Sequence, residues 1–146
     1  RAGRVAGTII GGGQSRFPGV LGTAILRAGH AEVARVGLRT EWLPQLGLTI
    51  DDVVTTTMNS TTASGYMPQS APMTIWVMAE RATGRLLGCQ IVGGRGAGKR
   101  IDTAATAIWN NMTVGDIALM DLSYAPPFSP VWDPVQIACR KLADQL

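Results

Sequence analysis

Two strand-like segments on either side of a glycine turn limit the possible folds of this chain more than any other part of its sequence. Residues 73–80 alternate apolar and more polar side chains with a period of two, which is typical of a strand with one buried face. The turn that follows, Thr83-Gly84, contains a residue that adopts positive φ without steric cost. Residues 85–92 then return as a second strand, so the sequence predicts an antiparallel hairpin.

Further strands are expected before this hairpin. Residues 21–38 mix apolar and small side chains and predict two short strands, and the β-branched stretch Asp52–Thr57 predicts another. Between them, Thr40–Leu43 resembles a capped helical turn that leads to Gly47. The first part of the fold is therefore expected to consist mainly of strands.

The later part of the chain changes to a helical period. A helix is predicted over residues 99–112, with an apolar stripe formed by Ile101, Ala104, Ala105, Ile108, Trp109 and Met112. Thr113, with Asp116 three residues later, is typical of the capped start of a short helix through Met120. Asp133-Pro134 predicts the start of a terminal helix, whose apolar face carries Val135, Ala138, Cys139, Leu142 and Leu146. Strands followed by helices indicate an α+β fold, an antiparallel sheet with helices packed on one face.

Composition favours one globular domain. The 146 residues are 46% hydrophobic and only 16% charged, and their 13 basic residues form no run, so a nucleic-acid partner is not expected. No apolar run approaches the roughly 18 to 20 residues that span a bilayer, and no signal-peptide pattern opens the chain, so we expect no membrane partner. Residues 1–16 read as the end of a helix and a glycine-rich linker, and residues 17–146 as the domain.

A glycine-rich segment between the hairpin and the first predicted helix resembles a nucleotide-binding loop. Gly93–Lys99 fits the first seven positions of the phosphate-binding P-loop pattern. The eighth residue is Arg100, which cannot replace the Ser or Thr that holds Mg²⁺, and the preceding strands are antiparallel rather than part of a βαβ unit. We interpret the segment as a flexible strand-to-helix connection, with an anion site at the helix N-terminus as the lesser alternative.

Other residue types that commonly carry catalysis are poorly placed. The single histidine, His30, has no carboxylate partner recognisable by spacing, and no serine lies in a GxSxG turn. Cys139 falls on the apolar stripe of the last helix, and Cys89 alternates inward with Leu87 and Ile91, so both thiols are expected to be buried and unreactive. The two cysteines form no metal-ligand cluster, so no metal site is expected, and they suit a reducing cytoplasm.

The segment 122–134, LSYAPPFSPVWDP, has four prolines and three aromatic residues. Proline fixes φ and removes amide donors, so we expect a stiff extended loop that presents Tyr124, Phe128 and Trp132 at little entropic cost. Two interpretations remain open: a rigid crossover that packs on its own domain, or an edge that docks on a partner surface.

These motifs together resemble a known family. The segment 93–102 (GGRGAGKRID) followed by 122–134 is similar to the coenzyme A-disulfide reductases and NADH oxidases, which are pyridine nucleotide-disulfide oxidoreductases. The similarity extends back through 81–94, Ser64–Pro68 (SGYMP) and 17–24 (FPGVLGTA), and thus covers most of residues 17–140.

The resemblance implies a C-terminal dimerisation domain of a longer homodimeric enzyme that binds FAD and NAD(P)H elsewhere. Residues 1–16 would be the end of an FAD-domain helix plus linker. The chain has neither a GxGxxG unit in βαβ context nor the family's redox cysteine, so we expect no cofactor and no catalysis in the isolated chain. In the family, two tyrosines lie beside the partner's flavin, which implies catalytic roles in trans for Tyr66 and Tyr124.

By the same resemblance, the residues near the partner's flavin would be Ala125, Pro126, Pro127 and Phe128. Phe128 and Trp132 would also contribute to the interface. Many family members have a second tyrosine where this chain has Met67, so the electron acceptor, a disulfide or dioxygen, stays open. The alternatives are a stand-alone dimerisation or ligand-binding domain without a redox partner, and, more weakly, a nucleotide-binding protein that uses Gly93–Lys99.

Overall fold

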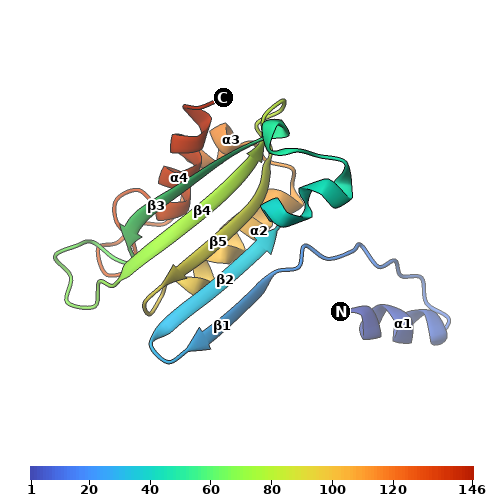
Figure 1. Ribbon diagram of the computed structural model, residues 1–146. Coiled ribbons are helices and arrows are strands. Elements are labelled where there is room, and N and C mark those ends of the chain that lie inside the picture. The colour runs from blue at the N-terminus through green and yellow to red at the C-terminus, as the bar shows by residue number, and fades with distance from the viewer.

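The computed structural model describes residues 1–146 and is built on one five-stranded antiparallel sheet (Figure 1). Its strands lie in the order β1-β2-β5-β4-β3. Their bounds are Ala24–Ala28 (β1), Ala31–Gly37 (β2), Val53–Thr61 (β3), Pro72–Glu80 (β4) and Leu86–Gly93 (β5). The two short strands expected within residues 21–38 are therefore present, and the strand expected at 52–57 extends to Thr61.

Three helices cover one face of this sheet (Figure 1). They are α2 (Ile101–Trp109), α3 (Val114–Ala118) and α4 (Pro134–Ala143). Helix α2 packs on β2 and β5, α4 packs on β3 and β4, and α3 packs against α4. This arrangement confirms the expected α+β fold with helices on one face of an antiparallel sheet.

The predicted hairpin is confirmed as β4 and β5, which pair with Ile75 opposite Ile91. The pairing shifts by one residue near its turn, because Met78 lies opposite Gly88 while Ala79 lies opposite Leu86. Leu87 is thus the extra residue of a β-bulge and leaves the inward series, whereas Leu86 is buried. The expectation that Leu87 alternates inward with Cys89 was wrong for this reason.

The first predicted helix, over residues 99–112, is shorter in the structure, where α2 spans Ile101–Trp109. A short 3-10 turn, η3 (Gly98–Arg100), precedes α2, and the chain leaves the helix through Asn111, whose φ is 53°. Trp109 is 48% exposed at the helix end, and Met112 lies beyond the helix. Neither residue therefore belongs to the helical stripe predicted for residues 99–112.

The starts of the other two helices are as predicted. Thr113 and Asp116 form a reciprocal capping box at α3, and Asp133 caps α4 with Pro134 in the first turn. Helix α4 ends at Ala143, so Leu146 lies beyond it and is exposed. The helix starts could be predicted because their capping bonds join neighbouring residues, whereas the helix ends depend on packing.

The hydrophobic core lies between the sheet and these helices. Its fully buried side chains come from every layer, and the largest include Ile75, Ile91, Ile101, Ile117 and Leu142. Burial of each such side chain contributes about 1.5–3 kcal/mol, so this layer holds the helices against the sheet.

The opposite face of the sheet is covered at one end by the 3-10 helix η1 (Thr40–Leu46). It ends at Gly47 with φ 71°, which confirms the helical turn predicted there. A smaller cluster of Leu43, Val53 and Met78 fixes it to the sheet. A second 3-10 turn, η2 (Ile50–Asp52), leads into β3.

Helix α1 (Ala2–Ile10) stands apart from the sheet in Figure 1 and has no buried residue. Residues 11–23 connect it to β1 without regular structure. No helix of the structure combines the length and the hydropathy that a bilayer crossing requires.

Candidate functional site

Two loops that are distant in the sequence lie side by side near one end of the sheet (Figure 1). The first, residues 62–71, joins β3 to β4 and carries Tyr66; the second, residues 119–133, joins α3 to α4 and carries Tyr124. The Ser64 N–H donates a hydrogen bond to the Pro126 carbonyl at 2.9 Å, so the main chains of the two loops are in direct contact. We call the two loops together the tyrosine rim.

Side chains add two further bonds across the rim. The Ser64 hydroxyl donates to the Ser129 carbonyl at 3.4 Å, and the Gln69 amide donates to the Pro127 carbonyl at 3.3 Å. All the acceptors are main-chain carbonyls of the proline-rich loop. Proline lacks an N–H group, so this segment can only accept such bonds at its proline positions, and the neighbouring loop supplies the donors.

The proline-rich segment is less extended than predicted. The N–H groups of Phe128 and Ser129 both donate to the Ala125 carbonyl, at 2.9 and 3.1 Å, and close a turn around the two adjacent prolines. This turn projects Phe128, which is 77% exposed. The loop is thus bent at its centre rather than extended throughout.

Both tyrosines of the chain point at least partly into solvent. Tyr66 is 76% exposed and Tyr124 is 48% exposed. Trp132 is 47% exposed, and the guanidinium of Arg140 lies 4.4 Å from its ring centre, which restrains the indole against α4. The structure therefore brings the loops of both tyrosines together and leaves several aromatic side chains on them partly or largely uncovered, as is typical of an interface.

Arg100 lies behind this rim and contacts four parts of the chain. Its Nε donates to Asp133 Oδ2 at 3.1 Å, and the two side chains are only 10% and 14% exposed. Its terminal nitrogens donate to the carbonyls of Thr62, Phe128 and Gly96, each at 2.6 Å. Both loops of the rim, the glycine-rich connection and the cap of α4 thus meet at one guanidinium group.

The glycine-rich connection is held in place by a carboxylate from β2. Glu32 Oε2 accepts from the N–H groups of Gly96 and Gly98 at 3.0 and 2.9 Å. These bonds, with Gly98 the stronger contributor, keep the pKa of Glu32 below its ordinary value. The segment is therefore held by hydrogen bonds in this structure, and the Glu32 carboxylate occupies the amide groups that a phosphate would need.

The glycine-rich strand-to-helix connection is filled by Glu32, and the sheet is antiparallel throughout, so this connection is not the dinucleotide-binding loop of a βαβ unit. The residues expected near the partner's flavin, Ala125, Pro126, Pro127 and Phe128, are exposed or half-buried in the rim. The phenols can donate or accept a hydrogen bond at the edge of such a site.

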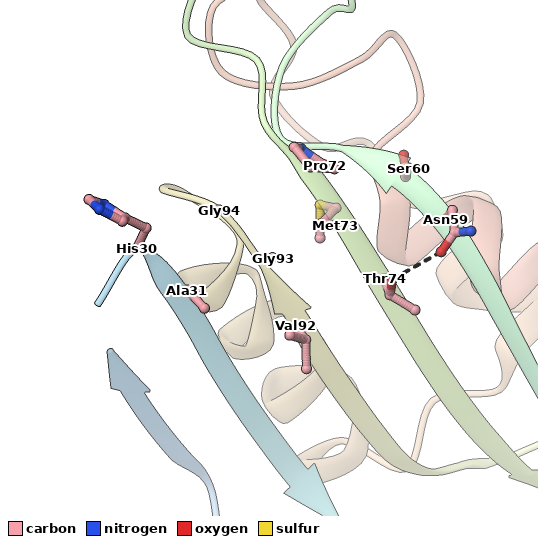
Figure 2. Close-up of a pocket in the computed structure, with 10 residues that line it drawn as sticks. All are labelled: His30, Ala31, Asn59, Ser60, Pro72, Met73, Thr74, Val92, Gly93 and Gly94. Atoms are coloured by element: carbon pink, nitrogen blue, oxygen red, sulfur yellow. Dashed lines mark hydrogen bonds between the residues drawn. The ribbon is translucent and has the colours of Figure 1, made fainter. Parts of the chain in front are cut away.

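A shallow groove of about 640 Å³ lies at the rim end of the helix-free face (Figure 2). Asn59 and Thr74 line it and are joined by a hydrogen bond from the Thr74 hydroxyl to Asn59 Oδ1 at 2.9 Å. His30 lies at its edge, in the turn between β1 and β2, and is its one titratable side chain. No carboxylate lines the groove, so His30 has no acid–base partner there.

Both cysteines are free and buried, as predicted. Burial raises the pKa of Cys139 to about 12, and burial together with the nearby Cys139 raises that of Cys89 further. Thiols with such pKa values are almost entirely protonated near neutral pH and are poor nucleophiles. No group of three or more His, Cys, Asp or Glu side chains is placed to hold a metal ion.

The two tyrosine loops can be recognised from the sequence, whereas the residues that hold them together cannot. Arg100 was visible only as the residue that breaks the P-loop pattern, and its partners lie 4 to 38 positions away. Glu32 gave no local signal either, because it reaches the glycines only through the pairing of β2 with β5. Both contacts depend on the order of strands in the sheet.

Comparison with known proteins identifies the same type of domain. Residues 25–134 match the family model described as the pyridine nucleotide-disulphide oxidoreductase dimerisation domain. The chain is 38% identical over 142 residues to an NAD(P)H coenzyme A polysulfide/persulfide reductase of Pyrococcus horikoshii, covering 97% of this chain and 31% of that protein. It is 32% identical over 146 residues to an NADH oxidase of Methanocaldococcus jannaschii, covering 100% of this chain and 32% of the relative.

A solved structure is similar in fold as well as in sequence. The NAD-dependent persulfide reductase from A. fulgidus superposes with a TM-score of 0.89 at 36% identity, over 98% of this chain and 26% of that chain. The chain thus spans about a third of the length of its curated relatives.

Proposed function

Since this chain belongs to the dimerisation domain family of the pyridine nucleotide-disulphide oxidoreductases, we propose that it joins two copies of a flavin-dependent reductase and completes their active sites. The observation that carries this proposal is the tyrosine rim. Its exposed aromatic side chains lie on two hydrogen-bonded loops, and such an uncovered patch is typical of a surface that another chain covers.

We propose further that residues 17–146 form the dimerisation domain and that residues 1–16 end a preceding FAD domain. FAD and NAD(P)H would be bound by parts of the parent protein other than this chain. The parent reaction would pass electrons from NAD(P)H through FAD, which supplies the redox chemistry, to a disulfide, a persulfide or dioxygen. The two buried free thiols are compatible with a reducing compartment, and we propose a cytoplasmic location.

Within this scheme the phenols of Tyr66 and Tyr124 act in the partner subunit's site. A phenol O–H can donate a hydrogen bond to a cysteine thiolate or to a sulfur or oxygen atom of the acceptor, and this bond strengthens as negative charge develops there. Residues Ala125 to Phe128 would cover the site and exclude water. The roles of the chain are therefore to orient the acceptor, to stabilise charge and to close the site.

The dimer is tested by measuring the association state of the full-length protein with sedimentation equilibrium. Phe128→Asp should weaken association at least about a hundredfold, because a two-fold interface loses one buried phenyl ring from each copy and each is worth about 1.5–3 kcal/mol. Phe17→Asp is the matched control, since Phe17 is the other phenylalanine, is 43% exposed and lies outside the rim. A monomeric wild-type protein, or equal effects of the two variants, would contradict the proposed interface.

The tyrosines are tested in the full-length enzyme by steady-state kinetics. Tyr66→Phe or Tyr124→Phe should lower kcat about ten- to a hundredfold, which is the value of a hydrogen bond to a charged group. Met67→Leu is the control, because it changes the neighbouring side chain and leaves the phenol in place. Unchanged kcat in both tyrosine variants would reduce them to packing residues.

Supply in trans has its own test. One weakly active homodimer carries Phe at positions 66 and 124, and another, which is inactive, carries Ser in place of the parent's redox cysteine. Mixed dimers should regain one active site, because the intact cysteine then faces intact tyrosines from the other subunit. If the tyrosines served their own subunit, the mixed dimers would gain no activity over the weakly active homodimer.

A further inference from the structure

We propose that Arg100 is the positioning residue of the tyrosine rim: it sets the two tyrosine-bearing loops relative to each other and to α4. This inference rests on the proposed function only in taking the rim as the part of the chain that completes the partner's site. The contacts of Arg100 themselves are independent of that role.

The geometry assigns separate N–H groups of Arg100 to separate segments. One terminal nitrogen donates to both Thr62 and Phe128, so a single atom joins the first loop to the second. The other terminal nitrogen holds the Gly96 carbonyl, and Nε holds Asp133. These contacts fill four of the five donors in the planar fork that a guanidinium group presents.

Arg100 binds each loop close to its tyrosine. Thr62 lies four positions before Tyr66, and Phe128 lies four positions after Tyr124. Between each contact and its tyrosine, the main chain is further restrained by the Ser64 to Pro126 hydrogen bond. A displacement of Arg100 would therefore shift both tyrosines relative to the partner surface, rather than one of them.

The ion pair with Asp133 extends the restraint to the terminal helix. Asp133 Oδ2 receives the Arg100 Nε–H, while its other oxygen, Oδ1, accepts from the Val135 N–H at 2.8 Å and caps α4. One carboxylate thus fixes both the guanidinium group and the start of the helix that follows the rim. Because Val135 is fully buried, this anchor is tied to the core.

Lysine cannot reproduce this arrangement. An ammonium group is a compact point charge with three donors on one atom, whereas the four acceptors here surround an extended planar group. The three carbonyls would lose partners even though the charge remains. The effect of Arg100→Lys should therefore be confined to the loops, because lysine keeps a positive charge beside Asp133 while the carbonyls of Thr62 and Phe128 lose their partners.

Hydrogen exchange of the 146-residue chain, with and without Arg100→Lys, tests this inference without any cofactor. The reporting amides are Ser64 and Met67 in one loop and Phe128 and Ser129 in the other, all hydrogen-bonded within the rim. Their exchange should accelerate at least about tenfold, because each loop loses a charge-assisted bond. The amides of β4 and β5 should keep their rates.

Arg85→Lys is the matched control, since Arg85 is 45% exposed and pairs with Glu80 away from the rim. Unchanged exchange in either loop of Arg100→Lys would overturn the inference. So would an equal acceleration throughout the sheet, because Arg100 would then stabilise the whole fold rather than the rim. Arg100→Gln, which keeps one donor site, should give the same local pattern with a larger change.

A double-mutant cycle in the full-length enzyme adds a readout that simple destabilisation would not move. If Arg100 sets the position of Tyr66, the loss of kcat caused by Tyr66→Phe should shrink at least about threefold in the Arg100→Lys background. Fully independent effects on kcat would count against positioning. If Tyr66→Phe alone leaves kcat unchanged, the proposed function fails, and the exchange experiment still decides the role of Arg100.

Discussion

Replacing Glu32 by Gln should destabilise the chain by about 1 kcal/mol at neutral pH. The native carboxylate accepts two main-chain N–H bonds, from Gly96 and Gly98, at 3.0 and 2.9 Å. Hydrogen bonds to charged groups are worth about 1.5–3 kcal/mol each when buried, and we reduce this value because Glu32 lies near the surface. The amide keeps an acceptor oxygen and loses the charge. For a chain of this size the change corresponds to about 3 °C in Tm.

The size of the destabilisation by Glu32→Gln should depend on pH. The pKa of Glu32 is lower in the folded chain than its ordinary value of 4.5, so the ionised form is the one that folding favours. Its contribution is fully present above pH 4.5 and is lost as the pH falls through the lower folded-state pKa. The difference in unfolding free energy between wild type and Glu32→Gln should therefore shrink as the pH is lowered below 4.5.

Urea unfolding followed by circular dichroism at several pH values measures this difference. A second variant, Glu32→Ala, provides a further test, because it leaves the two glycine N–H groups open to an anion at the start of η3. Sulfate should then raise the Tm of Glu32→Ala more than that of the wild type. A Glu32→Gln variant as stable as the wild type at pH 7, or a gap that stays constant into acid, would refute the reasoning.

The remaining predictions concern buried groups and backbone strain. Gly37→Ala should destabilise the chain by more than about 3 kcal/mol in urea unfolding, because a Cβ there would lie 2.2 Å from the Leu87 carbonyl oxygen at a φ of 72°. Gly47→Ala, with a similar φ but open space, should cost only about 1–2 kcal/mol. Neither Cys89 nor Cys139 should react with a thiol reagent such as DTNB before unfolding, since burial raises both pKa values.

The sequence predicted those parts of the fold that depend on neighbouring residues. The hairpin, the capping box at Thr113, the Asp133-Pro134 helix start and the turn at Gly47 all follow from residue types within a few positions of one another. These features are determined by local sterics and hydrogen bonding, so the amino-acid sequence alone is sufficient to predict them.

Other features are set by partners that the sequence does not place side by side. The β-bulge that turns Leu87 away from the core depends on how β5 registers with β4, and no local pattern marks it. Trp109 has helical spacing but is the last residue of α2 and is 48% exposed. Periodicity shows which face of a helix is apolar, and not how far the sheet extends beneath it.

In the candidate site, too, local features could be predicted from the sequence and long-range contacts could not. The aromatic and proline content of residues 122–134 marked one loop of the rim, and the family resemblance marked Tyr66 in the other. That the two loops touch, and that Arg100 and Asp133 hold them, required the three-dimensional arrangement. The exposed residues of the rim were therefore easier to predict than the residues that hold its loops in place.

The bonds from Arg100 to the rim end on main-chain oxygen atoms at Thr62 and Phe128. Every amino acid supplies the same carbonyl, so a change of side chain at either position leaves its acceptor in place. Substitutions on the exposed surface of the rim can then accumulate over evolution without a compensating change at Arg100. A lineage can in this way change the side chains that its rim presents to an acceptor while it keeps the Arg100 hydrogen bonds that hold the two loops.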